Sequence, residues 1–83
     1  MSWNGTDSDL GGFMIIRLKD VVHALSGKIE IRFWDGRHHV FMGRCNSRQE
    51  LLKSKAYELC QDDEVVILNA HNDILFVCVR DVD

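Results

Sequence analysis

The sequence predicts an α+β fold, specifically a two-layer sandwich in the order helix, hairpin, helix, hairpin. Two stretches have helical periodicity, one alternating stretch ends in Asp35-Gly36, and two apolar, β-branched runs follow near the C-terminus. We expect a four-stranded, mainly antiparallel sheet with both helices on one face. The 83 residues, 46% hydrophobic and 28% charged, match one globular domain. We place this domain at residues 14–83 and expect residues 1–13 to be a flexible N-terminal arm or an added leader.

The first predicted helix follows from apolar residues at helical spacing. Four of them fall at i, i+3, i+4 and i+7, which is one stripe of an amphipathic helix. They are Leu18, Val21, Val22 and Leu25. Gly27 comes next, and glycine commonly ends a helix because it adopts the left-handed conformation without strain.

The first hairpin is predicted on both sides of Asp35-Gly36. Residues 28–34 alternate apolar and polar side chains, as in a half-buried strand. Asp-Gly favours a two-residue turn, so Trp34 should pair with Arg37 in a return strand over residues 37–45. Paired residues share a face. The core face then collects Ile29, Ile31, Phe33, His38, Val40 and Met42. The opposite face collects Glu30, Arg32, Trp34, Arg37, His39 and Phe41.

The second helix is predicted from a capping box. Ser47 is followed three residues later by Glu50, and we expect a helix from this point to about Cys60. Helical spacing then predicts its buried stripe, which consists of Leu51, Leu52, Ala56 and Leu59.

The second hairpin is unusual because its strands are apolar on both faces. Residues 64–70 and 74–79 are nearly continuous apolar runs, and Asn72 in the segment between them tolerates the left-handed conformation of a turn. Such runs are typical of strands buried on both sides. A second copy of the chain, giving a homodimer, is the preferred cover for the second face. The alternatives are the N-terminal arm through Trp3, Leu10 and Phe13, a different protein, or tolerated exposure of some valines.

Five residues of the face opposite the core are predicted to bind a protein. Arginine and aromatic residues dominate the energetics of interfaces because they bury a large area and keep a polar group. The same types can stack on bases, but a net charge of −3 argues against a nucleic-acid partner. A cross-strand ladder without a partner is the other alternative. The five residues are Arg32, Trp34, Arg37, His39 and Phe41.

Charge is divided unevenly along the chain. Residues 14–60 contain nine Lys and Arg against five Asp and Glu, whereas residues 61–83 contain one Arg against six acids. Acids at turns and termini usually serve solubility. An alternative function is to present carboxylates as a phosphate backbone does and to occupy a nucleic-acid site on another protein. The residues of this acidic alternative are Asp62, Asp63, Glu64 and Asp73.

The spacing of cysteines and histidines does not predict chemistry. Cys45, Cys60 and Cys78 form no CxxC motif, and the four histidines lack the spacing of zinc ligands. An odd number of scattered cysteines is typical of free structural thiols in a reducing compartment. We therefore predict a non-enzymatic, cytoplasmic protein with no cofactor, no bound metal and no membrane segment.

Three stretches follow one another along the chain: MIIRLKDVVHALSG, KIEIRFWDG and NAHNDILFV. Their order of elements resembles that of short uncharacterised α+β proteins of bacterial phages and mobile elements. The resemblance covers the order of elements over residues 14–83. It implies a small accessory protein that acts by binding in the host cytoplasm, a class that includes anti-CRISPR proteins. Many such inhibitors are far more acidic than this chain. An inhibitor of a defence or nucleic-acid-handling complex is therefore the alternative to a self-associating interaction module.

Overall fold

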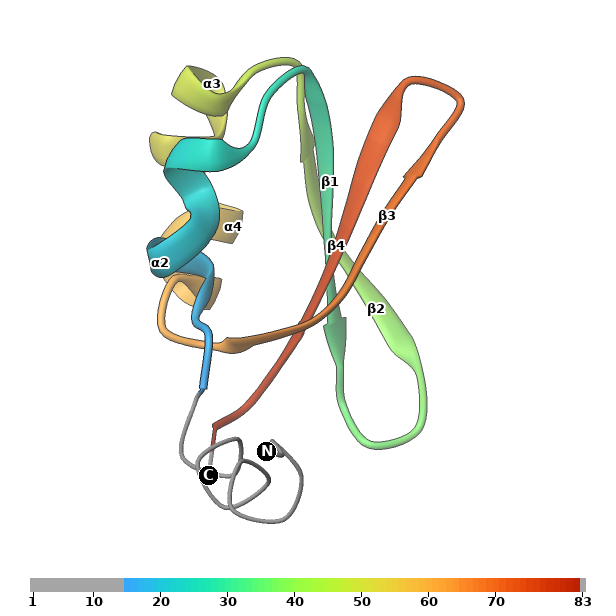
Figure 1. The fold of residues 1–83 in the computed structure, drawn as a ribbon. Coiled ribbons are helices and arrows are strands. Elements are labelled where there is room, and N and C mark those ends of the chain that lie inside the picture. Colours follow the sequence, from blue (N-terminus) through green and yellow to red (C-terminus); the bar gives the residue numbers. More distant parts are fainter. Residues whose placement is uncertain (1–14, 83) are drawn as a thin grey trace, which may run out of the picture.

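A computed structural model describes residues 15–82 and has the predicted α+β class. Its described part contains a four-stranded mixed sheet, three short α-helices and one 3₁₀ turn (Figure 1). The predicted N-terminal arm, residues 1–13, lies outside the described residues.

The first helical segment is shorter than its apolar stripe suggests. It consists of the α-helix α2 (Leu18–Val21) and the 3₁₀ turn η1 (Val22–Ala24). Leu18 and Val22 are buried, as is Leu25 directly after η1. Gly27 follows with a φ of 73°, a conformation that glycine adopts without strain.

Strands β1 (Lys28–Trp34) and β2 (His39–Cys45) pair antiparallel. The predicted pairing of Trp34 with Arg37 is wrong, because Trp34 pairs with His39. The carboxylate of Asp35 accepts hydrogen bonds from the backbone N–H groups of residues 37 and 38, each 2.8 Å long, and these bonds hold both residues in the loop. Since the partner of Trp34 shifts by two residues, His39 and Phe41 keep their predicted face.

The second predicted helix is divided into α3 (Arg48–Leu52) and α4 (Lys55–Cys60). Ser54 causes the division. Its hydroxyl donates to the carbonyl of Leu51 over 2.6 Å and accepts from the backbone N–H of Tyr57 over 3.1 Å. Serine at this position ends one helix and caps the next, because its side chain competes for backbone groups.

The division also changes which residues of this segment are buried. Leu51 and Ala56 are buried as predicted, but Leu52 is 46% exposed and Leu59 is 59% exposed. The predicted stripe assumed one continuous helix, and the break at Ser54 rotates α4 relative to α3.

Strands β3 (Glu64–His71) and β4 (Ile74–Arg80) also pair antiparallel. Their turn consists of Asn72 and Asp73, with φ values of 52° and 67°, which agrees with the left-handed conformation predicted for the asparagine.

The sheet has the strand order β2-β1-β4-β3. The central strands β1 and β4 are parallel, so the prediction of a mainly antiparallel sheet is wrong and the sheet is mixed. The chain crosses from β2 through α3 and α4 to the outer strand β3 before it returns into the centre as β4. Local pattern carries no information on this long-range pairing, which depends on how the helices dock.

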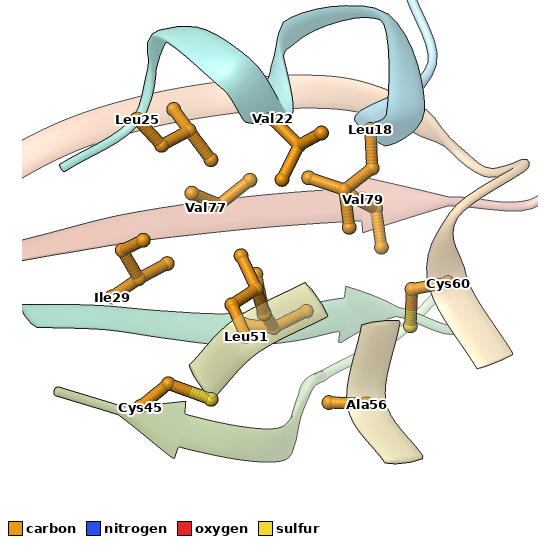
Figure 2. Close-up of a cluster of buried hydrophobic side chains, with 11 residues drawn as sticks. Leu18, Val22, Leu25, Ile29, Cys45, Leu51, Ala56, Cys60, Val77 and Val79 are labelled. Atoms are coloured by element: carbon orange, nitrogen blue, oxygen red, sulfur yellow. The ribbon is translucent and has the colours of Figure 1, made fainter. Parts of the chain in front are cut away.

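The hydrophobic core lies between the helices and one face of the sheet (Figure 2). Its buried members are Leu18, Val22, Leu25, Ile29, Ile31, Cys45, Leu51, Ala56, Cys60, Val77 and Val79. Within one chain, the residues of β3 from Val66 to His71 are exposed, so the burial of this strand on both faces, which the sequence analysis attributes to a cover such as a second copy, stays a prediction. β3 is one of the two edge strands of the sheet, and Figure 1 shows the far end of its hairpin away from the helices.

A candidate protein-interaction surface on the sheet

The face of the sheet that points away from the core carries the predicted site. Alternation along β1 puts Ile29 and Ile31 in the core, so the polar residues between and after them point the other way. The pairing register adds the neighbouring residues of the other strands. We call the following set the open face: Glu30, Arg32, Trp34, His39, Phe41, Arg44, Glu64, Ile67, Asn69, His71, Ile74, Phe76, Cys78 and Arg80.

Four of the five predicted binding residues come together on the open face. Arg32 is paired with Phe41, and Trp34 with His39, across β1 and β2. The rings of Trp34 and His39 lie 4.9 Å apart between centroids, and Phe41 is 60% exposed. The fifth residue, Arg37, lies in the loop and not on the sheet, because the loop between β1 and β2 has four residues where two were predicted.

A β-bulge in β2 adds an arginine that the predicted pairing did not place there. Ile31 pairs with Gly43 and Arg32 with Phe41, so Met42 is the extra residue of the bulge. Beyond the bulge the faces of β2 are exchanged relative to a regular strand. Arg44 therefore lies opposite Glu30 on the open face.

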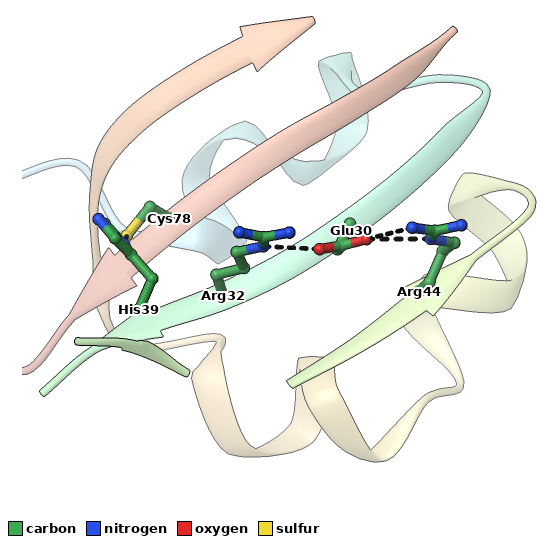
Figure 3. A network of polar contacts seen from close by, with 5 residues as sticks. All are labelled: Glu30, Arg32, His39, Arg44 and Cys78. Carbon is green, nitrogen blue, oxygen red and sulfur yellow. Dashed lines mark hydrogen bonds and ion pairs between the residues drawn. The ribbon is translucent and has the colours of Figure 1, made fainter. Parts of the chain in front are cut away.

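Glu30 is the buried centre of a polar network on the open face (Figure 3). Its side chain is 1% exposed, and one oxygen accepts from Arg32 Nε over 2.6 Å. The other oxygen accepts from Arg44 Nε over 3.0 Å and from Arg44 Nη2 over 2.7 Å. Every buried side-chain oxygen and nitrogen in the described residues has a partner, so this burial does not leave Glu30 unsatisfied.

The two guanidinium groups set the charge of Glu30. Burial raises the pKa of this carboxyl group, but the hydrogen bonds from Arg44 and Arg32 and their positive charges lower it by more, so the net pKa lies below 4.5. Arg32 also lies over the ring of Phe76, with 5.2 Å from its guanidinium carbon to the ring centroid. Contacts to Glu30 and to Phe76 thus orient Arg32, and its side chain remains 44% exposed.

A thiol and an imidazole also meet on the open face. His39 Nδ1 lies 3.1 Å from Cys78 Sγ, which joins β2 to β4 across β1 (Figure 3). Burial raises the pKa of the Cys78 thiol, and the charge of Arg32 offsets only part of this effect. A nucleophilic cysteine needs the opposite shift, because the thiolate is the reactive form. The contact therefore fits a structural hydrogen bond better than an activated nucleophile.

Two depressions lie on the open face. One has a volume of about 340 Å³ and is lined by Arg32, His39, Ile67, Asn69, His71, Phe76, Val77 and Cys78. The second has a volume of about 280 Å³ and is lined by Trp34, His39, Val66, Ile67 and Arg80. His39 and Ile67 border both, so the two depressions adjoin. Aromatic and aliphatic side chains with a few charged groups are the usual lining of surface pockets that receive a partner's side chains.

The acidic residues of the alternative site are not gathered in one place. Asp62 and Asp63 immediately precede β3, whereas Asp73 lies in the turn after it, about 25 Å away along a strand of this length. Asp62 is paired with Lys19 over 2.7 Å, which lowers its pKa, and Glu64 is paired with Arg80 over 3.0 Å.

Asp63 differs from its acidic neighbours. Burial raises its pKa, and the negative charge of Asp81 adds to this shift. The acidic hypothesis remains a prediction from the sequence.

Comparisons with known proteins return no relative. No family model, no curated protein and no solved structure matches this chain. The resemblance to phage proteins therefore remains a prediction.

Across residues 15–82 no three histidine, cysteine or acidic side chains gather in a way that suits a metal ion. No helix of this described part combines the length and the apolar character that a membrane span requires.

Several open-face residues were missed by sequence reasoning. Glu30 was assigned to the correct face, but its burial depends on Arg44, which only the bulge brings opposite. Ile67, Phe76 and Cys78 belong to continuous apolar runs, in which alternation does not show which side chain points to which face. Once the parallel register of β4 against β1 is known, their faces follow from the partner residues.

Proposed function

We propose that this protein is a small, non-catalytic interaction module that self-associates through the open face. The proposal includes the predicted two-layer arrangement, in which the helices cover one sheet face and a second copy covers the other. The observation that carries it is the exposure of large apolar side chains beside an oriented arginine. Phe41 is 60% exposed and Ile67 is 49% exposed, and Arg32 lies between them on the sheet.

The size of the open face is compatible with a dimer. Four strands about 4.8 Å apart and about seven residues long span roughly 19 Å by 23 Å, a flat footprint of about 440 Å². Accessible area exceeds the flat footprint because side chains protrude. The face thus approaches the roughly 600 Å² per partner that the smaller stable interfaces bury.

Most charges of the open face are paired within one copy. Arg32 and Arg44 both pair with Glu30, and Arg80 pairs with Glu64, so three guanidinium groups against two carboxylates leave one net positive charge on each face. These internal pairs limit the repulsion between two identical faces to that of the one excess charge. The apolar residues between them supply the driving force.

Light scattering over a concentration series tests the proposal. The wild type should approach twice the monomer mass as concentration rises, whereas Phe41→Asp should remain monomeric with an unchanged circular dichroism spectrum. Leu59→Asp is the matched control, because Leu59 is equally exposed at 59% but lies on α4. It should leave association unchanged.

Three outcomes would contradict the proposal: a wild type that is monomeric at every concentration, a Phe41→Asp variant that still dimerises, or a control that dissociates. A monomeric wild type would direct attention to the inhibitor hypothesis. The matching test replaces Asp62, Asp63 and Asp73 by Asn and measures capture of a nucleic-acid-handling complex at increasing salt.

A further inference from the structure

The larger depression of the open face, of about 340 Å³, takes its lining from all four strands. β4 lies between β1 and β3 in the sheet and contributes Phe76 and Cys78. The side chains that border the depression on the two flanks are Ile67, Asn69 and His71 of β3, Arg32 of β1 and His39 of β2. Aromatic and aliphatic groups with a few polar side chains are the usual lining of a small-molecule site.

The flanks of this depression favour a negatively charged group. Among the described residues, no acidic side chain lines it, whereas Arg32 contributes a full positive charge. The imidazole groups of His39 and His71 can donate further hydrogen bonds. Glu30, which Arg32 contacts, is shared with Arg44, so one positive charge of these three residues is left over. Charge complementarity therefore selects an anion.

Arg32 is held in place with its terminal nitrogens available. Its Nε donates to Glu30 over 2.6 Å, and its guanidinium carbon lies 5.2 Å from the ring centroid of Phe76. Within residues 15–82, neither Nη1 nor Nη2 of Arg32 has a hydrogen-bond or ion-pair partner. The planar guanidinium fork matches both oxygens of a carboxylate. Because Glu30 and Phe76 already orient this side chain, binding costs little of its rotamer freedom.

The rest of the depression suits an apolar group. Burial raises the pKa of the Cys78 thiol, which keeps this residue uncharged at neutral pH. Ile67 is 49% exposed and lies across Cys78 from Arg32, since both residues pair with Cys78. Two strand spacings, about 10 Å, separate the backbones of Ile67 and Arg32. A molecule of the size of phenylacetate can therefore contact both side chains at once.

We propose that this depression binds a small carboxylate with an apolar body. The terminal nitrogens of Arg32 hold the carboxylate, and Ile67 and Phe76 contact the apolar part. The site is complete within one copy. A second copy over the open face would cover it, so the ligand and the second copy exclude one another. This last consequence rests on the proposed function.

An NMR titration with phenylacetate tests the site in the full chain, at a protein concentration at which light scattering gives the monomer mass. A ligand of about ten non-hydrogen atoms should bind with a Kd of about 1 mM and shift the signals of Asn69 and Phe76. 2-Phenylethanol lacks the charge and acetate lacks the ring, so each should bind about tenfold more weakly. Unshifted signals with phenylacetate, or equal affinity for acetate, would overturn the proposal.

Variants separate the two parts of the site. Arg32→Gln should weaken phenylacetate about tenfold and leave 2-phenylethanol unchanged, a difference that a folding defect would not produce. Ile67→Ser alters an exposed side chain and should weaken both ligands severalfold. Arg80→Gln is the matched control, because Arg80 is 53% exposed and also contacts a carboxylate through Nε, but it lies outside this depression. Full affinity in the first two variants, or an equal loss in the control, would refute the assignment.

Light scattering tests the exclusion of a second copy. Phenylacetate at ten times its Kd should raise the protein concentration of half-dissociation about 100-fold, because each of the two copies contributes a factor of about 11. A dimer that dissociates at the same concentration with and without the ligand would overturn the exclusion. A wild type that is monomeric throughout would refute the proposed function alone, because the NMR titration measures the depression in one copy.

Discussion

The replacement Glu30→Gln tests the most specific feature of the open face. Glu30 is 1% exposed and accepts three hydrogen bonds from two guanidinium groups. Glutamine has nearly the same shape, so packing against Phe76 and the neighbouring strands is preserved. The change removes the negative charge and one acceptor oxygen, and it leaves two positive charges without their common partner.

The expected loss of stability follows from the exposure of the two arginines. A hydrogen bond to a charged group contributes about 1.5–3 kcal/mol when it is buried. Arg32 and Arg44 are about half exposed, at 44% and 51%, so water replaces much of what they lose. We expect a decrease of about 2 kcal/mol in the free energy of unfolding at pH 7, which lowers the Tm of a domain of this size by about 10 °C.

The pH dependence separates the charge of Glu30 from its shape. Its pKa is lowered in the folded state, because the arginines outweigh the effect of burial, so the unfolded chain binds the proton more tightly. The stabilisation is therefore present above about pH 4.5 and is lost as pH falls through the lower folded pKa. Denaturant unfolding should show a larger difference between wild type and Glu30→Gln at pH 7 than at pH 3.

The control for this experiment is Glu58→Gln. Glu58 is 66% exposed and pairs with Lys55 over 3.4 Å, so its replacement should change stability by less than about 0.5 kcal/mol. Equal stability of Glu30→Gln and the wild type at pH 7 would refute the role of the network. The same difference at pH 7 and pH 3 would show that charge is not the cause.

Three further predictions concern the helices and the core. Gly43→Val should lower the free energy of unfolding by about 1–3 kcal/mol, because even a Cβ at Gly43 would lie 3.1 Å from Ala56 Cβ. Adding Ala56→Gly to this variant should recover part of the loss, as measured in a double-mutant cycle. Ser54→Ala should lower the free energy of unfolding by about 1 kcal/mol, because it removes the hydroxyl that accepts a hydrogen bond from Tyr57 N and caps α4. An unchanged stability in thermal unfolding would contradict this role. Burial raises the pKa of Cys60 from 9.0 to about 11. The free energy of unfolding should therefore fall between pH 9 and pH 11, and it should fall less steeply in Cys60→Ala than in the wild type. The same pH dependence in both proteins would count against a buried neutral thiol at position 60.

Much of the candidate site was accessible from the sequence because strand alternation is local. The alternation of Ile29, Glu30 and Ile31 assigned the faces of β1, and the shift of two residues in the hairpin left His39 on the predicted face. Arg37 was misplaced because Asp35 holds residues 37 and 38 in a loop that is longer than the two-residue turn favoured by Asp-Gly.

The sequence by itself determined the features that depend on a few neighbouring residues. These are the α+β class, the left-handed turn at Asn72, the cap at Ser47 and the alternating faces of β1. Each follows from backbone sterics, from a side chain that bonds to nearby backbone, or from the period of a strand.

Only the tertiary structure decided the parallel pairing of β1 with β4, the bulge at Met42 and the burial of Glu30. The pairing joins strands more than forty residues apart in sequence, so its stability arises from the docking of helices on the sheet. Burial of Glu30 requires Arg32 and Arg44 together, and the bulge brings Arg44 to the correct face. Such features depend on contacts between distant segments, which no local pattern records.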